Sequence, residues 1–100
     1  MPDRFELVVQ PPAASDIEDA AHWYEERAAG LGVEFTDEVD RCLESIRPNP
    51  QRFPVIHRDI RRVLLKRFPY AVFFVLRENV VNVIACMHMR RRPGRWQRRR

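Results

Sequence analysis

A succession of three short apolar runs between Arg61 and Arg92 constrains the fold more than any other feature of the chain. In the first run Val63 and Leu65 alternate with their neighbours, whereas residues 70–76 and 80–87 are almost continuously apolar and rich in β-branched and aromatic side chains. Continuous runs of this kind suit strands that are buried on both faces. The region therefore predicts a three-stranded sheet that ends in a block of arginines.

Turn residues separate these runs. Phe68-Pro69 interrupts the first pair, because proline has no N–H to donate to a strand ladder and restrains the residue before it. Glu78-Asn79 is a two-residue hairpin loop by its position, and asparagine tolerates the positive φ that such loops require. The connections are short, so we expect neighbouring strands to be antiparallel.

The N-terminal part of the chain predicts a strand and a helical hairpin. Residues 5–9 resemble a short strand, and Pro11-Pro12 marks the first turn of a helix. Gly30 and Gly32 bracket a tight link to a second helix, which Pro48-Asn49-Pro50 ends. The apolar positions repeat at helical spacing in both helices. They are Ala13, Ile17, Ala20, Ala21, Tyr24 and Ala28 in the first, and Phe35, Val39, Cys42, Leu43 and Ile46 in the second.

Residues 51–59 predict an extended loop or a short irregular strand that leads into the sheet. The order of elements is then β-α-α-β-β-β, an α+β fold in which the helical hairpin covers one face of a small, mainly antiparallel sheet. We expect the other face to be left for another molecule. One hundred residues, without a low-complexity linker, fit one domain spanning 1–100, with residues 93–100 as a basic tail.

Charge is divided unequally along the chain. Residues 1–60 carry 6 Lys+Arg against 13 Asp+Glu, a net charge of −7, whereas residues 61–100 carry 12 against a single acid, a net charge of +11. Such an excess attracts a polyanion or an acidic protein partner. For Arg98, Arg99 and Arg100 we expect only a solvated tail. Neither a membrane span nor a signal peptide is indicated, so a cytoplasmic location is expected.

The sequence predicts neither a metal site nor a cofactor site. Cys42 and Cys86 lie in apolar patterns without CxxC or histidine-ligand spacing, which indicates buried, reduced thiols. His22 and His57 have no partners at ligand spacing. A Gly-rich phosphate loop, a nucleophile elbow and a helix-turn-helix signature are all missing, which disfavours a nucleotide hydrolase and a transcription factor.

Three stretches together carry a resemblance to a known superfamily. WYEERAAGLGVEF, NPQRFPVIHRDIRRVLLKRFPYAVFFV and VIACMHMRRRPGRW, in this order and spacing, resemble the RelE/ParE toxins of bacterial type II toxin–antitoxin modules. The resemblance covers nearly the whole chain. It implies a β-α-α-β-β-β toxin that inhibits growth until a cognate antitoxin, wrapping it with an extended or helical segment, neutralises it.

The superfamily contains two activities. RelE-like members are endoribonucleases, many of which cut mRNA on the ribosome, and ParE-like members inhibit DNA gyrase without being nucleases. Either target is compatible with the resemblance, and so is a third alternative, an inactive module that binds only its antitoxin or nucleic acid. The expected partners are an acidic antitoxin segment and either the mRNA on the ribosome or gyrase, with no membrane.

Metal-free RNA cleavage needs groups that activate a ribose hydroxyl, stabilise the phosphorane and protonate the leaving oxygen. By the pattern of some ribonuclease members, Arg67 and His88 occupy the places of a functional arginine and histidine. Trp23 and Tyr24 are expected in core and rim packing, and Trp96 is expected to pin the tail to the helices. Phosphate contacts are predicted for four further residues, with Arg62 and Lys66 on one strand face and Arg61 and Arg67 on the other. These residues are Arg61, Arg62, Lys66 and Arg90.

Overall fold

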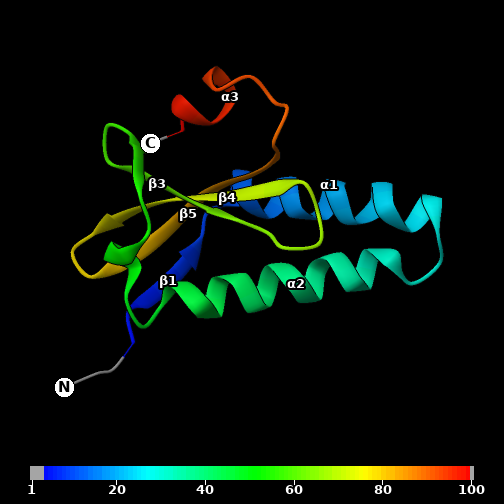
Figure 1. Cartoon of the computed structure of the whole chain (residues 1–100), viewed down its shortest axis with the longest axis horizontal. Coiled ribbons are helices and arrows are strands. Elements are labelled where there is room, and N and C mark those ends of the chain that lie inside the picture. The colour runs from blue at the N-terminus through cyan, green and yellow to red at the C-terminus, as the bar shows by residue number, and fades with distance from the viewer. Residues whose placement is uncertain (1–3, 100) are drawn as a thin grey trace.

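The computed structural model describes residues 4–99 as two long helices packed on one face of a sheet, with a short helix on the opposite side (Figure 1). None of the helices in this range combines the length and the apolar composition needed to cross a membrane. The elements are β1 (Glu6–Val9), α1 (Pro11–Arg27), α2 (Leu31–Ile46), the 3₁₀ turn η1 (Pro50–Arg52), β2 (Val55–His57), β3 (Ile60–Leu64), β4 (Tyr70–Arg77), β5 (Val80–His88) and α3 (Gly94–Gln97).

The strands of the described residues form one five-stranded sheet in the order β1-β5-β4-β3-β2. The N-terminal strand β1 lies at an edge and is parallel to β5, whereas all other neighbours are antiparallel. Residues 51–59, for which an extended loop or an irregular strand was expected, contain the end of η1 and the short edge strand β2. The predicted α+β fold with a helical hairpin on a mainly antiparallel sheet is confirmed.

The β4–β5 hairpin forms at the predicted two-residue loop. Glu78 and Asn79 have φ angles of 50° and 66°, and Arg77 pairs with Val80 across the turn. Positive φ at both loop residues is the geometry whose twist matches that of paired strands. The loop therefore sets the register in which the two apolar strands bury both of their faces.

Close contact between α1 and α2 depends on two glycines. Gly30 has a φ of 87° and precedes the first turn of α2, as expected of a glycine in a tight link. Gly32 lies inside α2 rather than in the link, and a Cβ there would lie 2.7 Å from the carbonyl oxygen of Ala21. The Glu25 carboxylate accepts the N–H groups of Gly30 and Gly32, each at 2.9 Å, and these bonds lower its pKa. This carboxylate therefore fixes the start of α2.

The main core lies between the helical hairpin and the sheet. At its centre the ring of Phe35 packs against Tyr24, Phe68 and Tyr70 at centroid distances of 5.1–5.3 Å. Tyr24 therefore packs as predicted, while Trp23 stays half exposed at the rim with the guanidinium of Arg27 over its ring. The helix stripes predicted from the sequence supply most of the buried residues. These are Ala13 and Ala20 from α1, and Phe35, Val39, Leu43 and Ile46 from α2.

The second face of the sheet is not left open as expected, because the C-terminal segment covers part of it. The Trp96 ring stacks on Phe73 at 4.5 Å between centroids and joins a second buried cluster, so it pins the segment to the sheet and not to the helices. Arg99 is not a solvated tail residue either, since its guanidinium binds the Asp16 carboxylate at 2.5 Å. Arg100 lies outside the described residues. Sheet packing and one ion pair therefore order the segment before it.

Candidate functional site

The connection between β3 and β4 carries two of the predicted site residues. Because β3 ends at Leu64, Lys66 and Arg67 lie in this connection, and the predicted division of their side chains between two strand faces is wrong. The buried Glu38 carboxylate of α2 accepts the backbone N–H of Lys66 at 2.6 Å and that of Arg67 at 2.8 Å. Sequence reasoning missed Glu38, although an acid one helical turn from both Phe35 and Cys42 lies on the apolar stripe. The acid holds the basic connection in place.

The Arg67 side chain is already engaged by an acid. Its guanidinium donates to the Glu34 carboxylate at 2.7 Å, and this contact raises the pKa of Arg67. Arginine is protonated under all ordinary conditions, so it serves as a hydrogen-bond donor and a fixed charge and not as an acid or base. Arg67 can therefore bind a phosphate or a carboxylate only in competition with Glu34.

A groove of about 720 Å³ lies along the edge of β3, between that strand and α2. We call it the β3 groove. Its walls include apolar groups of Cys42, Phe53 and Leu65 together with the half-exposed Leu64. Its single acid, Glu38, is turned toward the backbone. The groove has a basic rim consisting of Arg41, Arg52, Arg62, Lys66 and Arg67.

His88 lies at the end of β5, opposite Tyr70, with ring centroids 5.3 Å apart. Its Nδ1 accepts the backbone N–H of Arg90 at 3.0 Å, so the neutral ring carries its proton on Nε2. Both His88 and Arg90 line a second groove, of about 750 Å³, which we call the His88 groove. Its other charged and aromatic lining residues are Asp16, Asp19, Trp23, Tyr24, Tyr70, Arg91 and Arg95.

The six predicted site residues are thus divided between separate places. Arg62, Lys66 and Arg67 lie at the β3 groove, and His88 and Arg90 lie at the His88 groove. Arg61 donates to the carbonyl oxygens of Gln51 at 3.0 Å and Phe53 at 2.6 Å, where it holds the chain after η1. Arg67 and His88 therefore do not line a common cavity, and a catalytic role for either stays a prediction.

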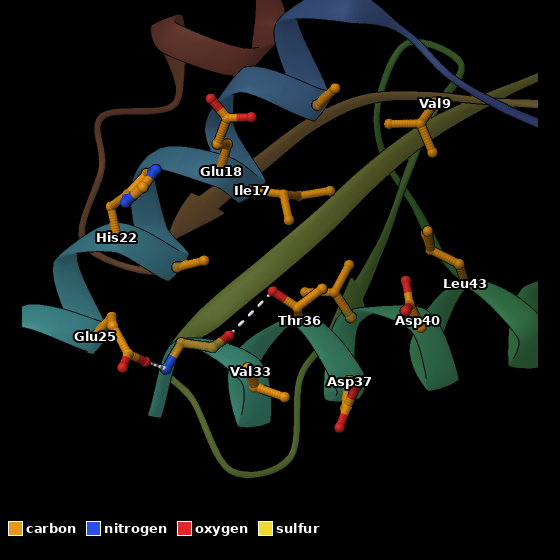
Figure 2. A pocket seen from close by; sticks show the side chains of 14 residues that line it. Val9, Ile17, Glu18, His22, Glu25, Val33, Thr36, Asp37, Asp40 and Leu43 are labelled. Carbon is orange, nitrogen blue, oxygen red and sulfur yellow. Dashed lines mark hydrogen bonds between the residues drawn. The ribbon is translucent and has the colours of Figure 1, made fainter. Parts of the chain in front are cut away.

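A third groove, of about 640 Å³, runs between the two long helices, and we call it the helix groove. Figure 2 shows Val9, Ile17 and Leu43 along its apolar floor, with Val33 beside the opening. The hydroxyl of Thr36 donates to the Gly32 carbonyl oxygen at 3.0 Å and so leaves this floor. The helix groove has an acidic rim consisting of Glu18, Glu25, Asp37 and Asp40 (Figure 2).

Asp16 has a structural task that the sequence did not reveal. Since β1 ends at Val9, opposite Val83, it leaves the following part of the β5 edge unpaired. There the Asp16 carboxylate accepts the N–H of Cys86 at 3.0 Å, and Arg99 donates to the Ile84 carbonyl oxygen at 3.2 Å. These partners are 70 or 15 residues apart in the chain, and no sequence spacing signals them.

The cysteines are free thiols, as predicted. Cys86 is buried and Cys42 partly so, and burial is the main cause that raises the pKa of each thiol to about 12. Reaction at cysteine requires the thiolate, so both are poor nucleophiles near neutral pH. Within residues 4–99 no three His, Cys, Asp or Glu side chains gather as metal ligands would.

Comparison with known proteins supplies what the grooves alone do not. A family model described as the ParE toxin of the type II toxin–antitoxin system parDE matches residues 7–93. A solved chain from the chromosomal ParDE toxin–antitoxin system of P. aeruginosa superposes with a TM-score of 0.71 at 15% identity, over 84% of this chain and 95% of that one. At this identity the likeness shows the fold. No curated protein matches the chain.

Proposed function

Because the chain belongs to the ParE family of toxins from type II toxin–antitoxin systems, we propose that it arrests growth by binding DNA gyrase and not by cutting RNA. The family also implies an antitoxin partner that holds the toxin inactive. The gyrase assignment is the finer step, and it rests on how the charged side chains of the two basic grooves are arranged.

The separation of Arg67 from His88 carries the proposal. A metal-free ribonuclease must present a proton acceptor, a proton donor and a cation to one phosphodiester. Here the guanidinium of Arg67 binds Glu34 in one groove, while the imidazole of His88 lies in another. A protein target needs no such convergence, because binding alone can block it.

The composition of the His88 groove suits a protein target. Trp23 is 49% exposed, and Tyr24, Tyr70, Arg91 and the neighbouring arginines line the same concavity. Tryptophan, tyrosine and arginine are the residue types that most often dominate protein–protein binding energy. We therefore place the gyrase contact at this groove.

Cleavage of mRNA is the second candidate, and the same groove favours it. His88 and three arginines, at positions 90, 91 and 95, line one concavity together with Tyr70. Cations beside a histidine could hold an RNA phosphate while the imidazole transfers a proton. In this arrangement Arg67 is not part of the catalytic centre.

The deciding experiment is a supercoiling assay with purified gyrase, run beside transcript-end mapping in cells that express the toxin without antitoxin. We expect inhibited supercoiling and uncut transcripts. His88→Ala should leave gyrase inhibition within about threefold of wild type, whereas Trp23→Ala should weaken it by tenfold or more, as loss of an interface anchor does. Arg92→Ala, at an exposed position outside the His88 groove, is the matched control.

The opposite pattern would refute gyrase as the target. Transcript cleavage that disappears in His88→Ala, together with unaffected supercoiling, identifies the endoribonuclease. If growth, supercoiling and transcripts are all unaffected while the antitoxin still binds, the chain is an inactive binding module.

A further inference from the structure

We infer that the β3 groove is the docking site of the antitoxin, which adds an extended segment of alternating apolar and acidic residues to the open edge of β3. This inference rests on the toxin function, because it assigns the antitoxin's place on the chain. It requires neither gyrase nor RNA as the target. Three features of the groove carry it.

The first feature is an unpaired strand edge. β2 pairs with β3 only at Arg61 and Ile60, so the C-terminal half of β3 has no neighbour on that side. The N–H of Arg62 points outward to the Pro54 carbonyl oxygen, and the N–H of Leu65 points inward to Tyr70. Backbone groups alternate along a strand, so the N–H and C=O of Leu64 point outward into the groove. None of the hydrogen bonds between elements in residues 4–99 uses either group.

The second feature is apolar surface on both sides of this edge. Leu64 lies on the sheet face away from the helices and is 51% exposed. Val63 and Leu65 lie on the face toward α2, where Cys42 and Phe53 continue the apolar wall. An added strand would send alternate side chains toward α2 and toward the outer face. The inward residues of the antitoxin segment should therefore be apolar.

The third feature is charge that has no partner inside the protein. The ion pairs of residues 4–99 do not include Arg41, Arg62 or Lys66, although all three line the groove. The only acid of the groove, Glu38, already accepts two backbone N–H groups. Unpaired cations around an apolar channel complement carboxylates on an incoming strand and would repel a basic one. The outward residues of the segment should therefore be acidic.

The helix groove is the strongest competing place for the antitoxin. It has a comparable volume and an apolar floor, but its rim is acidic and would repel an acidic segment. It also has no open strand edge to pair with. The two grooves therefore make opposite predictions for matched substitutions of exposed side chains.

The test is growth of cells that express toxin variants together with the protein encoded by the antitoxin gene. Leu64→Asp and Arg41→Glu should remain toxic in its presence and should weaken the purified complex by about tenfold or more, as lost interface contacts do. Val33→Asp, at a 64% exposed position of the helix groove, and Arg92→Glu, outside all three grooves, are the matched controls. Both controls should be neutralised like wild type.

Neutralisation of all four variants would overturn the inference, as would escape of Val33→Asp alone, which would assign the antitoxin to the helix groove. A second measurement covers a variant that fails to fold. A capped octapeptide of alternating glutamate and valine, added to the wild-type chain, should protect the Leu64 amide from hydrogen exchange. The same peptide with lysine for glutamate should not, and equal protection by both, or by neither, refutes the site.

The gyrase proposal fails separately. It is measured on the chain alone, without antitoxin, so a toxin that spares gyrase but loses neutralisation through Leu64→Asp leaves the β3 groove assignment intact.

Discussion

The helical hairpin and the basic end of the sheet use their charges in different ways. Acids on the outer side of the hairpin, such as Asp37 and Asp40, line the helix groove and point to solvent. Acids on its inner side, Asp16, Glu34 and Glu38, bind backbone or guanidinium groups of residues 66–99. Opposite charges that are separated along the chain are therefore brought together in the fold, and only the basic groups that remain unpaired are free for a partner.

Removal of Trp96 should have the largest effect on this arrangement. Trp96→Ala should lower the free energy of unfolding by about 3 kcal/mol, because the side chain is buried against Phe73. Trp23→Ala, at a half-exposed ring, should cost less than about 1 kcal/mol. Urea denaturation measures both. Equal losses would mean that the C-terminal segment contributes no more to the fold than an exposed helix residue does.

Glu38→Ala tests whether a helix acid holds the basic connection. Without the carboxylate, the N–H groups of Lys66 and Arg67 lose their acceptor, which should cost about 2 kcal/mol. Hydrogen exchange at these two amides should accelerate more than exchange at Phe74 in the core. Glu38→Gln retains an acceptor oxygen and is the matched control, with a smaller expected loss. If the alanine and glutamine variants behave alike, the two bonds do not stabilise the connection.

Gly32→Ala tests the close approach within the hairpin. The added Cβ would lie 2.7 Å from the Ala21 carbonyl oxygen, so the helices must separate, at a cost of about 1–2 kcal/mol after the helix preference of alanine is subtracted. Thermal denaturation and the affinity for antitoxin can be measured on the same variant. We expect lower stability and unchanged affinity, since the β3 groove lies elsewhere. A weaker antitoxin complex would link the hairpin to the partner site.

Glu25→Gln should have the smallest effect, and one that depends on pH. The bonds from Gly30 and Gly32 lower the Glu25 pKa in the folded state, so the carboxylate adds stability above its unfolded pKa, and this is lost as pH falls through the folded value. The urea midpoints of the variant and wild type should differ near neutral pH and converge in acid. Glu26→Gln, whose acid contacts only the neighbouring Arg27, is the control. A difference that persists in acid would assign the effect to helix propensity.

Much of the fold could be predicted because local signals agreed with one another. The Glu78-Asn79 loop, the apolar runs on either side of it and the helix stripes around Phe35 predict the observed β4–β5 hairpin and hairpin of helices. Gly32 was misplaced by two positions of context, because a glycine required for helix–helix contact has the same local pattern as one required for a turn. The second sheet face was misjudged because one tryptophan in a basic segment carries no periodicity.

The candidate site was less predictable than the fold. Arg67 and His88 were chosen from a family pattern, which gives residue types in order but not their distances, and they line separate grooves. The unpaired edge of β3 was hidden because strand length depends on how far β2 extends, and β2 is only 3 residues long. Its neighbour Pro54 provides the last acceptor along that edge.

The sequence by itself determined the elements, the two-residue turn, the opposite charges of the two halves and membership of the toxin family. These properties reside in local patterns or in the order of short motifs, and they need no knowledge of long-range contacts. Only the tertiary structure decided which charges are spent. Whether a cation such as Arg67 or Arg41 is free depends on an acid brought near it by the packing of α2 on the sheet, and that distance is not encoded in any spacing along the chain.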